Sequence, residues 1–73
     1  MNYLYIFEDG TARIHHDPTP EDYEAVAEGV LDIYRFVNGK IQQYNPNSTR
    51  PTKYDEVPKA LFAVIKGRAF HTS

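Results

Sequence analysis

Two stretches of the chain alternate in hydrophobicity in the way that β-hairpins do. Residues 30–44 form two runs rich in β-branched and aromatic side chains, and Asn38-Gly39 joins them. Both residues of such a pair accept the positive φ of a two-residue type I′ turn, which fixes the register and places Val37 opposite Lys40. In this register both faces of the hairpin carry apolar side chains, so both faces need a cover.

The stretch 3–15 is built in the same way, with Asp9-Gly10 between two alternating runs. An Asp-Gly pair also favours a two-residue type I′ turn, so Glu8 is predicted to pair with Thr11. This register assigns one set of side chains to the core, namely Tyr3, Tyr5, Phe7, Ala12 and Ile14. It assigns a second set to the opposite face, namely Leu4, Ile6, Glu8, Thr11, Arg13 and His15.

A helix is predicted between the two hairpins. The prolines at positions 18 and 20 end the preceding strand, because proline lacks the N–H that a ladder needs. Thr19 is a suitable N-cap, with Pro20 at the first helical position and Asp22 where a capping-box acid would lie. Gly29 can adopt the left-handed conformation that ends a helix, directly before the second hairpin.

The last third of the chain is less regular. Residues 45–53 have no period and almost no apolar side chains, which predicts a flexible loop. Over 57–65 apolar residues recur at helical spacing, so a short helix is predicted there, with a strand over 61–65 as the alternative. Gly67 is expected to end this element, and residues 67–73 to form a flexible C-terminal tail.

These elements predict an α+β fold in one small domain over residues 1–66. Its centre is a four-stranded antiparallel sheet made of two hairpins, with one helix packed on a face, in the order β-β-α-β-β, plus the short C-terminal helix. A chain of 73 residues is close to the lower size limit for a single hydrophobic core, so a large catalytic cleft is not expected.

Composition narrows the class of protein further. The chain has no cysteine, which removes disulfides and thiolate metal sites and fits an intracellular protein. Neither a signal-like leader nor an apolar run long enough for a bilayer is present, so a soluble cytoplasmic protein is expected.

The cluster His15-His16-Asp17 resembles metal ligands. Adjacent strand side chains point to opposite faces, so we interpret these as ordinary strand-end histidines and expect neither a metal nor a cofactor.

The net charge of −2 conceals an asymmetry along the chain. The part up to residue 32 is acidic and has Arg13 as its one basic residue; its carboxylates are Glu8, Asp9, Asp17, Glu21, Asp22, Glu24, Glu28 and Asp32. The remainder is basic, with Arg35, Lys40, Arg50, Lys53, Lys59, Lys66 and Arg68 against Asp55 and Glu56. Such a chain could be steered toward a charged partner, although mutual neutralisation of the two parts is the simpler interpretation.

Candidate chemistry is sparse. A glycine-rich phosphate loop, a nucleophile elbow and a nucleophile beside a base are all missing from the pattern, so no enzymatic activity is expected. The basic residues of the C-terminal half, with Tyr54, Phe62 or Phe70 for base stacking, support an alternative function as a nucleic-acid-binding accessory protein. The acidic half would oppose a phosphate backbone, so direct nucleic-acid contact is the less favoured interpretation.

The surplus apolar side chains of the strands indicate protein binding. Aliphatic residues beside arginine and aromatic rings have the composition of a protein-binding patch. The predicted partner-binding residues are Leu4, Ile6 and Arg13 on one face of the first hairpin and Ile33, Arg35 and Tyr44 on one face of the second. Two alternatives remain open: the C-terminal helix covers this surface, or a homodimer buries it.

The opening run YLYIFEDGT, from Tyr3 to Thr11, the chain length, the lack of cysteine and the acidic helix before a second hairpin together resemble a family of small phage-encoded transcription regulators. The resemblance implies a non-enzymatic protein in the cytoplasm of the infected bacterial host. It also implies binding to the largest subunit of host RNA polymerase near that subunit's N-terminus, inhibition of sigma-dependent initiation, and antitermination. It assigns no binding residue to this chain.

Overall fold

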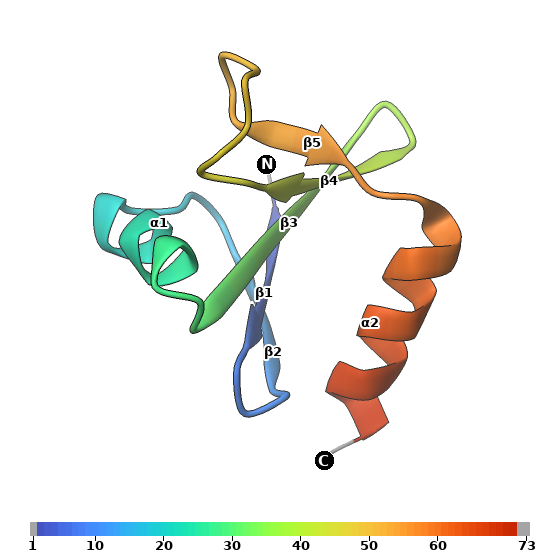
Figure 1. Ribbon diagram of the computed structural model, residues 1–73. Coiled ribbons are helices and arrows are strands. Elements are labelled where there is room, and N and C mark those ends of the chain that lie inside the picture. The colour runs from blue at the N-terminus through green and yellow to red at the C-terminus, as the bar shows by residue number, and fades with distance from the viewer. Residues whose placement is uncertain (1, 72–73) are drawn as a thin grey trace.

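The computed structural model describes residues 2–71, which form an α+β fold with a five-stranded antiparallel sheet and two helices (Figure 1). The elements are β1 (Tyr3–Phe7), β2 (Ala12–His15), α1 (Pro20–Ala27), β3 (Leu31–Val37), β4 (Lys40–Tyr44), β5 (Tyr54–Glu56) and α2 (Lys59–His71). The strand order in the sheet is β2-β1-β3-β4-β5. The α+β class and the first five elements agree with the sequence prediction. The fifth strand is an addition to it.

The hairpin of β3 and β4 has the predicted register. Asn38 and Gly39 have φ of 51° and 74°, as a type I′ turn requires, and Val37 lies opposite Lys40. Because both turn residues tolerate positive φ, the local sequence alone determines this pairing.

The hairpin of β1 and β2 is shifted by one residue from the prediction. Ile6 lies opposite Ala12, and the loop has three residues in place of two. The Phe7 amide donates to the Thr11 carbonyl (2.9 Å), and only Gly10 takes a positive φ (89°). Asp9 stays out of the left-handed region because its carboxylate accepts from the Thr11 amide (2.9 Å) and hydroxyl (2.7 Å). The shift moves every β2 side chain to the face opposite the predicted one.

Helix α1 is fixed at both ends by its own sequence. The Thr19 hydroxyl accepts from the Asp22 amide and the Asp22 carboxylate accepts from the Thr19 amide, which completes the predicted capping box. At the other end Gly29 has φ 81°, its amide donates to the Val26 carbonyl, and the Val30 amide donates to the Ala25 carbonyl. This pair of bonds is a Schellman motif, which leads the chain directly into β3.

Residues 45–53 contain no helix or strand, in agreement with the predicted loop, and side-chain hydrogen bonds connect this loop to the strand that follows it. Polar side chains bond to one another across it: Asn45 and Ser48 both donate to the Asp55 carboxylate, at 3.0 and 2.7 Å. These bonds bring Tyr54–Glu56 beside β4 as the fifth strand, with Tyr44 opposite Tyr54. Asp55 is therefore part of a strand.

Helix α2 is longer than predicted. Gly67 does not adopt a left-handed φ, so the helix continues through it to His71. Residues 67–71 of the predicted tail are thus helical, and residues 72 and 73 lie outside the described part of the chain. The strand alternative for residues 61–65 is wrong.

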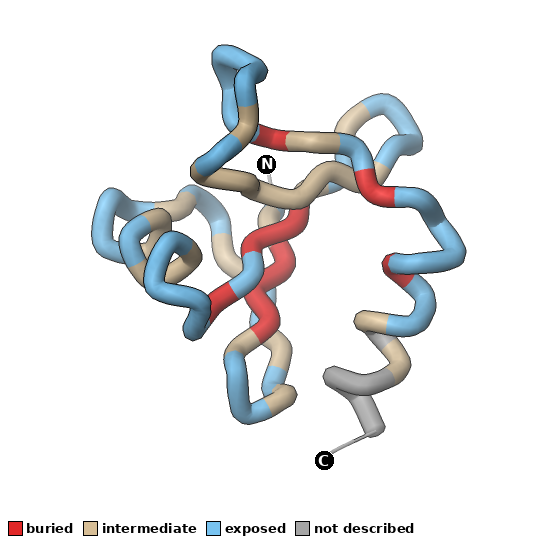
Figure 2. Tube along the Cα trace, in the orientation of Figure 1, coloured by how far each residue is buried: buried red, intermediate tan, exposed pale blue. Residues whose placement is uncertain are grey.

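The two faces of the sheet carry separate hydrophobic clusters, and each helix covers one of them (Figures 1 and 2). We call the face covered by α1 the α1 face; its buried residues are Tyr5, Leu31, Ile33 and Tyr54. We call the other the α2 face; its buried residues are Leu4, Ile6, Tyr34, Val57 and Phe62. Adjacent strand residues alternate between these clusters, which explains why both faces of the strands read as apolar in the sequence.

Candidate protein-binding surface

Three of the six predicted partner-binding residues lie in the core. Leu4, Ile6 and Ile33 are 6%, 8% and 0% exposed, so they offer almost no surface to a partner. Leu4 and Ile6 belong to the cluster on the α2 face, whereas Ile33 belongs to the cluster on the α1 face. The predicted cover by the C-terminal helix therefore applies to Leu4 and Ile6, and α1 covers the surroundings of Ile33.

Arg35 and Tyr44 are half-buried within a group of aromatic rings on the α1 face. The Arg35 guanidinium carbon lies 3.9 Å from the ring centroid of Tyr54, and its Nε donates to Gln42 (2.8 Å). The Tyr44 ring lies 4.3 Å from that of Tyr23 and 5.4 Å from that of Tyr54. These contacts are internal to the fold, and their binding role stays a prediction.

Arg13 is exposed on the edge strand β2. Because of the register shift it lies opposite Tyr5, on the α1 face of the sheet, and away from Leu4 and Ile6. Together with Phe7 and Val30 it lines a shallow hollow beside the first hairpin. The structure therefore separates Arg13 from Leu4 and Ile6 and places it on the same face as Ile33, Arg35 and Tyr44, with Tyr5 between Arg13 and Ile33. Its role in binding stays a prediction.

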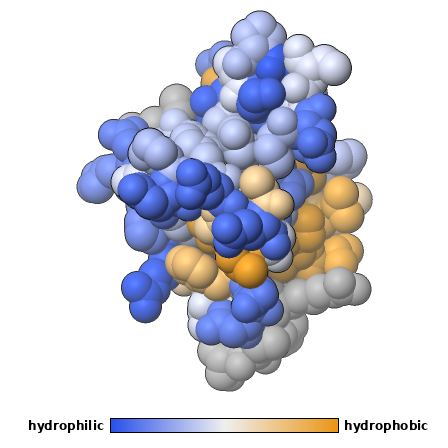
Figure 3. Space-filling model, turned by 60° about the vertical axis from the view of Figure 1, so that its left-hand side comes forward, coloured by the Kyte–Doolittle hydropathy of each residue, from blue (hydrophilic) through white to orange (hydrophobic). Residues whose placement is uncertain are grey.

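The outward side of α2 is an exposed apolar surface, although the helical spacing over 57–65 predicts a stripe that includes Leu61 and Val64 and packs as a unit. Leu61 and Val64 are 51% and 54% exposed, and we call these two residues the outer face of α2. The helix is anchored by Phe62, whose ring meets Tyr34 at 5.4 Å and Phe36 at 5.7 Å, and by half-buried Ile65. Figure 3 shows hydrophobic side chains gathered along one flank of the molecule, while hydrophilic ones cover most of the remainder of that view.

The reason for this error is the composition of the helix. Apolar residues occupy almost every position of 60–65, so two different stripes fit helical spacing equally well. The aromatic ring of Phe62 decides between them, because Tyr34 and Phe36 project from β3 toward it. The sequence of the helix alone does not show which of the two stripes faces the sheet.

Among the described residues no ion pair joins the acidic part of the chain to the basic part. The two ion pairs found there are Lys40 with Glu56 (3.2 Å) and Arg50 with Asp55 (3.8 Å), and both lie within the basic part. The second pair engages Arg50, one of the cations of the alternative nucleic-acid-binding function. Glu21, Glu24 and Glu28 remain exposed on α1, so the molecule keeps an acidic pole.

The Tyr5 hydroxyl connects the sheet to this acidic helix by donating to the Asp22 carboxylate (2.7 Å). Burial and the Asp22 hydrogen bond raise the pKa of Tyr5, so it stays protonated. Burial alone would raise the pKa of Asp22, but hydrogen bonds from Thr19 and Tyr5 outweigh it and lower that pKa. The His15 ring stacks on the Tyr5 ring, with 4.0 Å between the ring centroids. The described residues contain no group of three side chains that could bind a metal ion together.

Neither described helix combines the length and the apolarity that crossing a membrane requires. Comparison with known proteins finds no matching family model, no similar curated protein and no similar solved structure. Evidence on function therefore comes from the surface of this chain.

Proposed function

We propose that this chain is a phage-encoded regulator that acts in the cytoplasm of the infected bacterial host by binding RNA polymerase. It would inhibit sigma-dependent initiation and promote antitermination through protein–protein contact alone. The observation that carries the binding proposal is the outer face of α2, where Leu61 and Val64 expose aliphatic surface that the fold does not use. The choice of polymerase as the partner rests on the resemblance of the sequence to small phage regulators.

Two features of the fold support a docking role for α2. The helix attaches to the sheet by apolar contacts, and in the described side chains neither a hydrogen bond nor an ion pair joins it to a strand. Half-exposed Phe36 lies beside the anchor residue Phe62 and adds an aromatic ring next to the helix. Aliphatic and aromatic groups that are exposed together are typical of the centre of a protein interface.

The direct test is co-elution of the purified chain with bacterial core RNA polymerase and with the sigma-containing holoenzyme. A panel of polymerases is needed because the host is not identified. We expect a complex at micromolar concentration, and we expect the double substitution Leu61→Ser with Val64→Ser to weaken it at least tenfold. Ile14→Ser is the matched control for loss of exposed aliphatic surface, because Ile14 is 65% exposed and lies on the edge strand β2, on the α2 face of the sheet but outside the helix.

Transcription assays then test the regulatory part of the proposal. Wild-type chain should reduce sigma-dependent run-off transcript and increase readthrough at a terminator, and the double variant should do neither. Absence of binding to every core enzyme and holoenzyme would refute the proposal. A gel shift with DNA or RNA that weakens steeply with salt would instead indicate nucleic-acid binding.

A further inference from the structure

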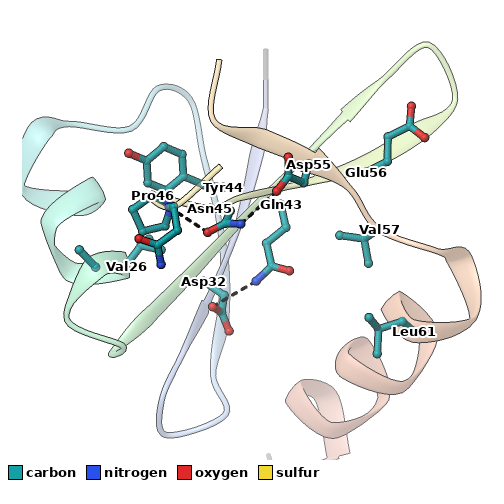
Figure 4. Close-up of a pocket in the computed structure, with 12 residues that line it drawn as sticks. Val26, Asp32, Gln43, Tyr44, Asn45, Pro46, Asp55, Glu56, Val57 and Leu61 are labelled. Carbon is teal, nitrogen blue, oxygen red and sulfur yellow. Dashed lines mark hydrogen bonds between the residues drawn. The ribbon is translucent and has the colours of Figure 1, made fainter. Parts of the chain in front are cut away.

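The outer face of α2 continues into a groove that has a carboxylate in its floor. This groove has a volume of about 480 Å³ and runs from the end of α1 at Val26 to Leu61 on α2 (Figure 4). Asp32 and Gln43 lie between these ends, on neighbouring strands. A volume of this size matches small-molecule and peptide side-chain pockets.

The groove exists because β4 departs from β3. The ladder between them ends at Tyr34 and Gln43, and the Asn45 amide donates to the Lys53 carbonyl (2.7 Å) on the β5 side. If the register continued, Pro46 would lie opposite Leu31. Proline has no N–H to donate to a ladder, so the chain leaves β3 and the space beside Asp32 stays open.

Asp32 differs from the other carboxylates of the groove in having no strong partner. Asp55 accepts from Ser48 and Asn45, and Glu56 pairs with Lys40. Asp32 has one hydrogen bond, a long one of 3.4 Å from the Gln43 side-chain amide. Burial raises the pKa of Asp32, and the Gln43 bond only partly opposes this. The groove therefore holds an exposed negative charge with no close partner among the described residues, and a cation would stabilise it.

On this basis we propose that the groove receives an arginine side chain of the bound protein, next to an aliphatic side chain that packs on Leu61. The guanidinium presents several donors in one plane, so it can serve the Asp32 carboxylate and the Gln43 carbonyl oxygen together, whereas an ammonium is a point charge. Val57 and Leu61 supply the apolar wall at the α2 end. The inference rests on the proposed function, and it specifies the chemistry of the partner segment.

A titration with a minimal probe tests the groove without any polymerase. The probe is N-acetyl-leucyl-arginine amide, and the matched ligand is its citrulline analogue, which keeps the shape and loses the charge. In two-dimensional NMR spectra we expect the arginine peptide to shift the Gln43 side-chain amide and the Leu61 methyl signals at millimolar concentration. The citrulline peptide should bind about tenfold more weakly, as expected for loss of a charge-assisted hydrogen bond.

Charge-matched variants separate the groove from general electrostatics. Asp32→Asn and Asp17→Asn each remove one exposed negative charge, but Asp17 lies outside the groove, in the segment before α1. We expect Asp32→Asn to reduce peptide affinity about tenfold and Asp17→Asn to change it less than twofold. The proposal is overturned if both variants behave alike, if citrulline binds as well as arginine, or if the shifts map outside the groove.

The same variants distinguish failure of this inference from failure of the proposed function. If polymerase binds wild type and Asp32→Asn equally, the function stands and the arginine contact is refuted. If no polymerase binds at all, the proposed function fails, whatever the peptide titration shows.

Discussion

The two faces of the sheet are stabilised in different ways. On the α1 face, hydroxyl and guanidinium groups fix the aromatic rings: Tyr5 bonds to Asp22, the Tyr23 and Tyr54 hydroxyls lie 3.1 Å apart, and Arg35 stacks on Tyr54. Helix α1 is also capped at both ends. On the α2 face, the helix is attached by the rings and aliphatic groups of its inward side, with Phe62 as the buried anchor.

This difference indicates which apolar surface is not needed for folding. Directional bonds specify one position for α1, so residues around it are committed to the core. Apolar contacts are not directional, and α2 carries aliphatic groups on both sides while using only one. The outer face of α2 is therefore free for a partner at little cost to folding, whereas the aromatic group of the α1 face is not.

The largest expected loss of stability comes from truncating a buried side chain in the hydrophobic cluster of either face. Ile33→Ala should lower the free energy of unfolding by about 2–5 kcal/mol, because Ile33 is fully buried. A loss of that size is a large part of the stability of so small a domain. Denaturant unfolding followed by circular dichroism measures this loss.

Phe62→Ala should act more locally and accelerate amide hydrogen exchange more in α2 than in α1. Equal acceleration in both helices would show that the two faces unfold as one unit.

The hydrogen bond between sheet and α1 gives the next effect. Tyr5→Phe should cost about 1.5–3 kcal/mol, since it removes a hydroxyl that donates to a carboxylate in a partly buried site. Tyr34→Phe is the matched control on the α2 face, because burial of Tyr34 is comparable and none of the described residues forms a hydrogen bond with its hydroxyl. Similar losses in both variants would contradict the proposed contrast between the faces.

Arg35 offers a smaller test of the aromatic group. Arg35→Ala should reduce stability by about 0.5–2 kcal/mol through loss of the stacking on Tyr54 and the bond to Gln42. Arg35→Lys should recover part of this, because the ammonium keeps the cation but not the planar stack. Polymerase binding measured on the same folded variants shows whether Arg35 also contacts the partner; unchanged affinity would assign it to the fold alone.

The smallest effect concerns pH. The folded-state pKa of Asp22 is lowered below its ordinary value of 3.8, so its carboxylate contributes stability that is present above that value and lost as pH falls through the folded pKa. The stability difference between wild type and Asp22→Asn should therefore be constant at neutral pH and shrink below pH 3.8. Thermal unfolding midpoints across this range provide the measurement, and a difference that grows with acid would reverse the sign of the argument.

Local chemistry determined what the sequence could predict. Thr19, Asp22 and Gly29 specify α1 by side-chain and backbone preferences that need no distant partner, and Asn38-Gly39 specifies its turn in the same way. The Asp9 turn was mispredicted because its carboxylate has a second option, bonding to Thr11, which a pair of residue types does not reveal.

The candidate site depended on distant contacts and was correspondingly harder to predict. The short strand β5 forms because Asn45 and Ser48 reach Asp55, and the orientation of α2 is decided by rings on β3. Leu4, Ile6 and Ile33 were recognised as surplus apolar residues, but periodicity alone could not show that a separate helix covers each side of the sheet. The groove at Asp32 had no counterpart in the sequence pattern.

The three-residue loop of the first hairpin has an evolutionary consequence. If the loop keeps its three residues, loss of the Thr11 codon would place Ala12 opposite Phe7 and Arg13 opposite Ile6, so Arg13 and Ile14 would exchange sides of the sheet. The edge of the molecule would then present a different chemistry with every side chain of β2 unchanged. The number of residues between this loop and β2 thus determines, as an inherited trait, which side chains β2 presents on each face, and natural variants of different length would show it directly.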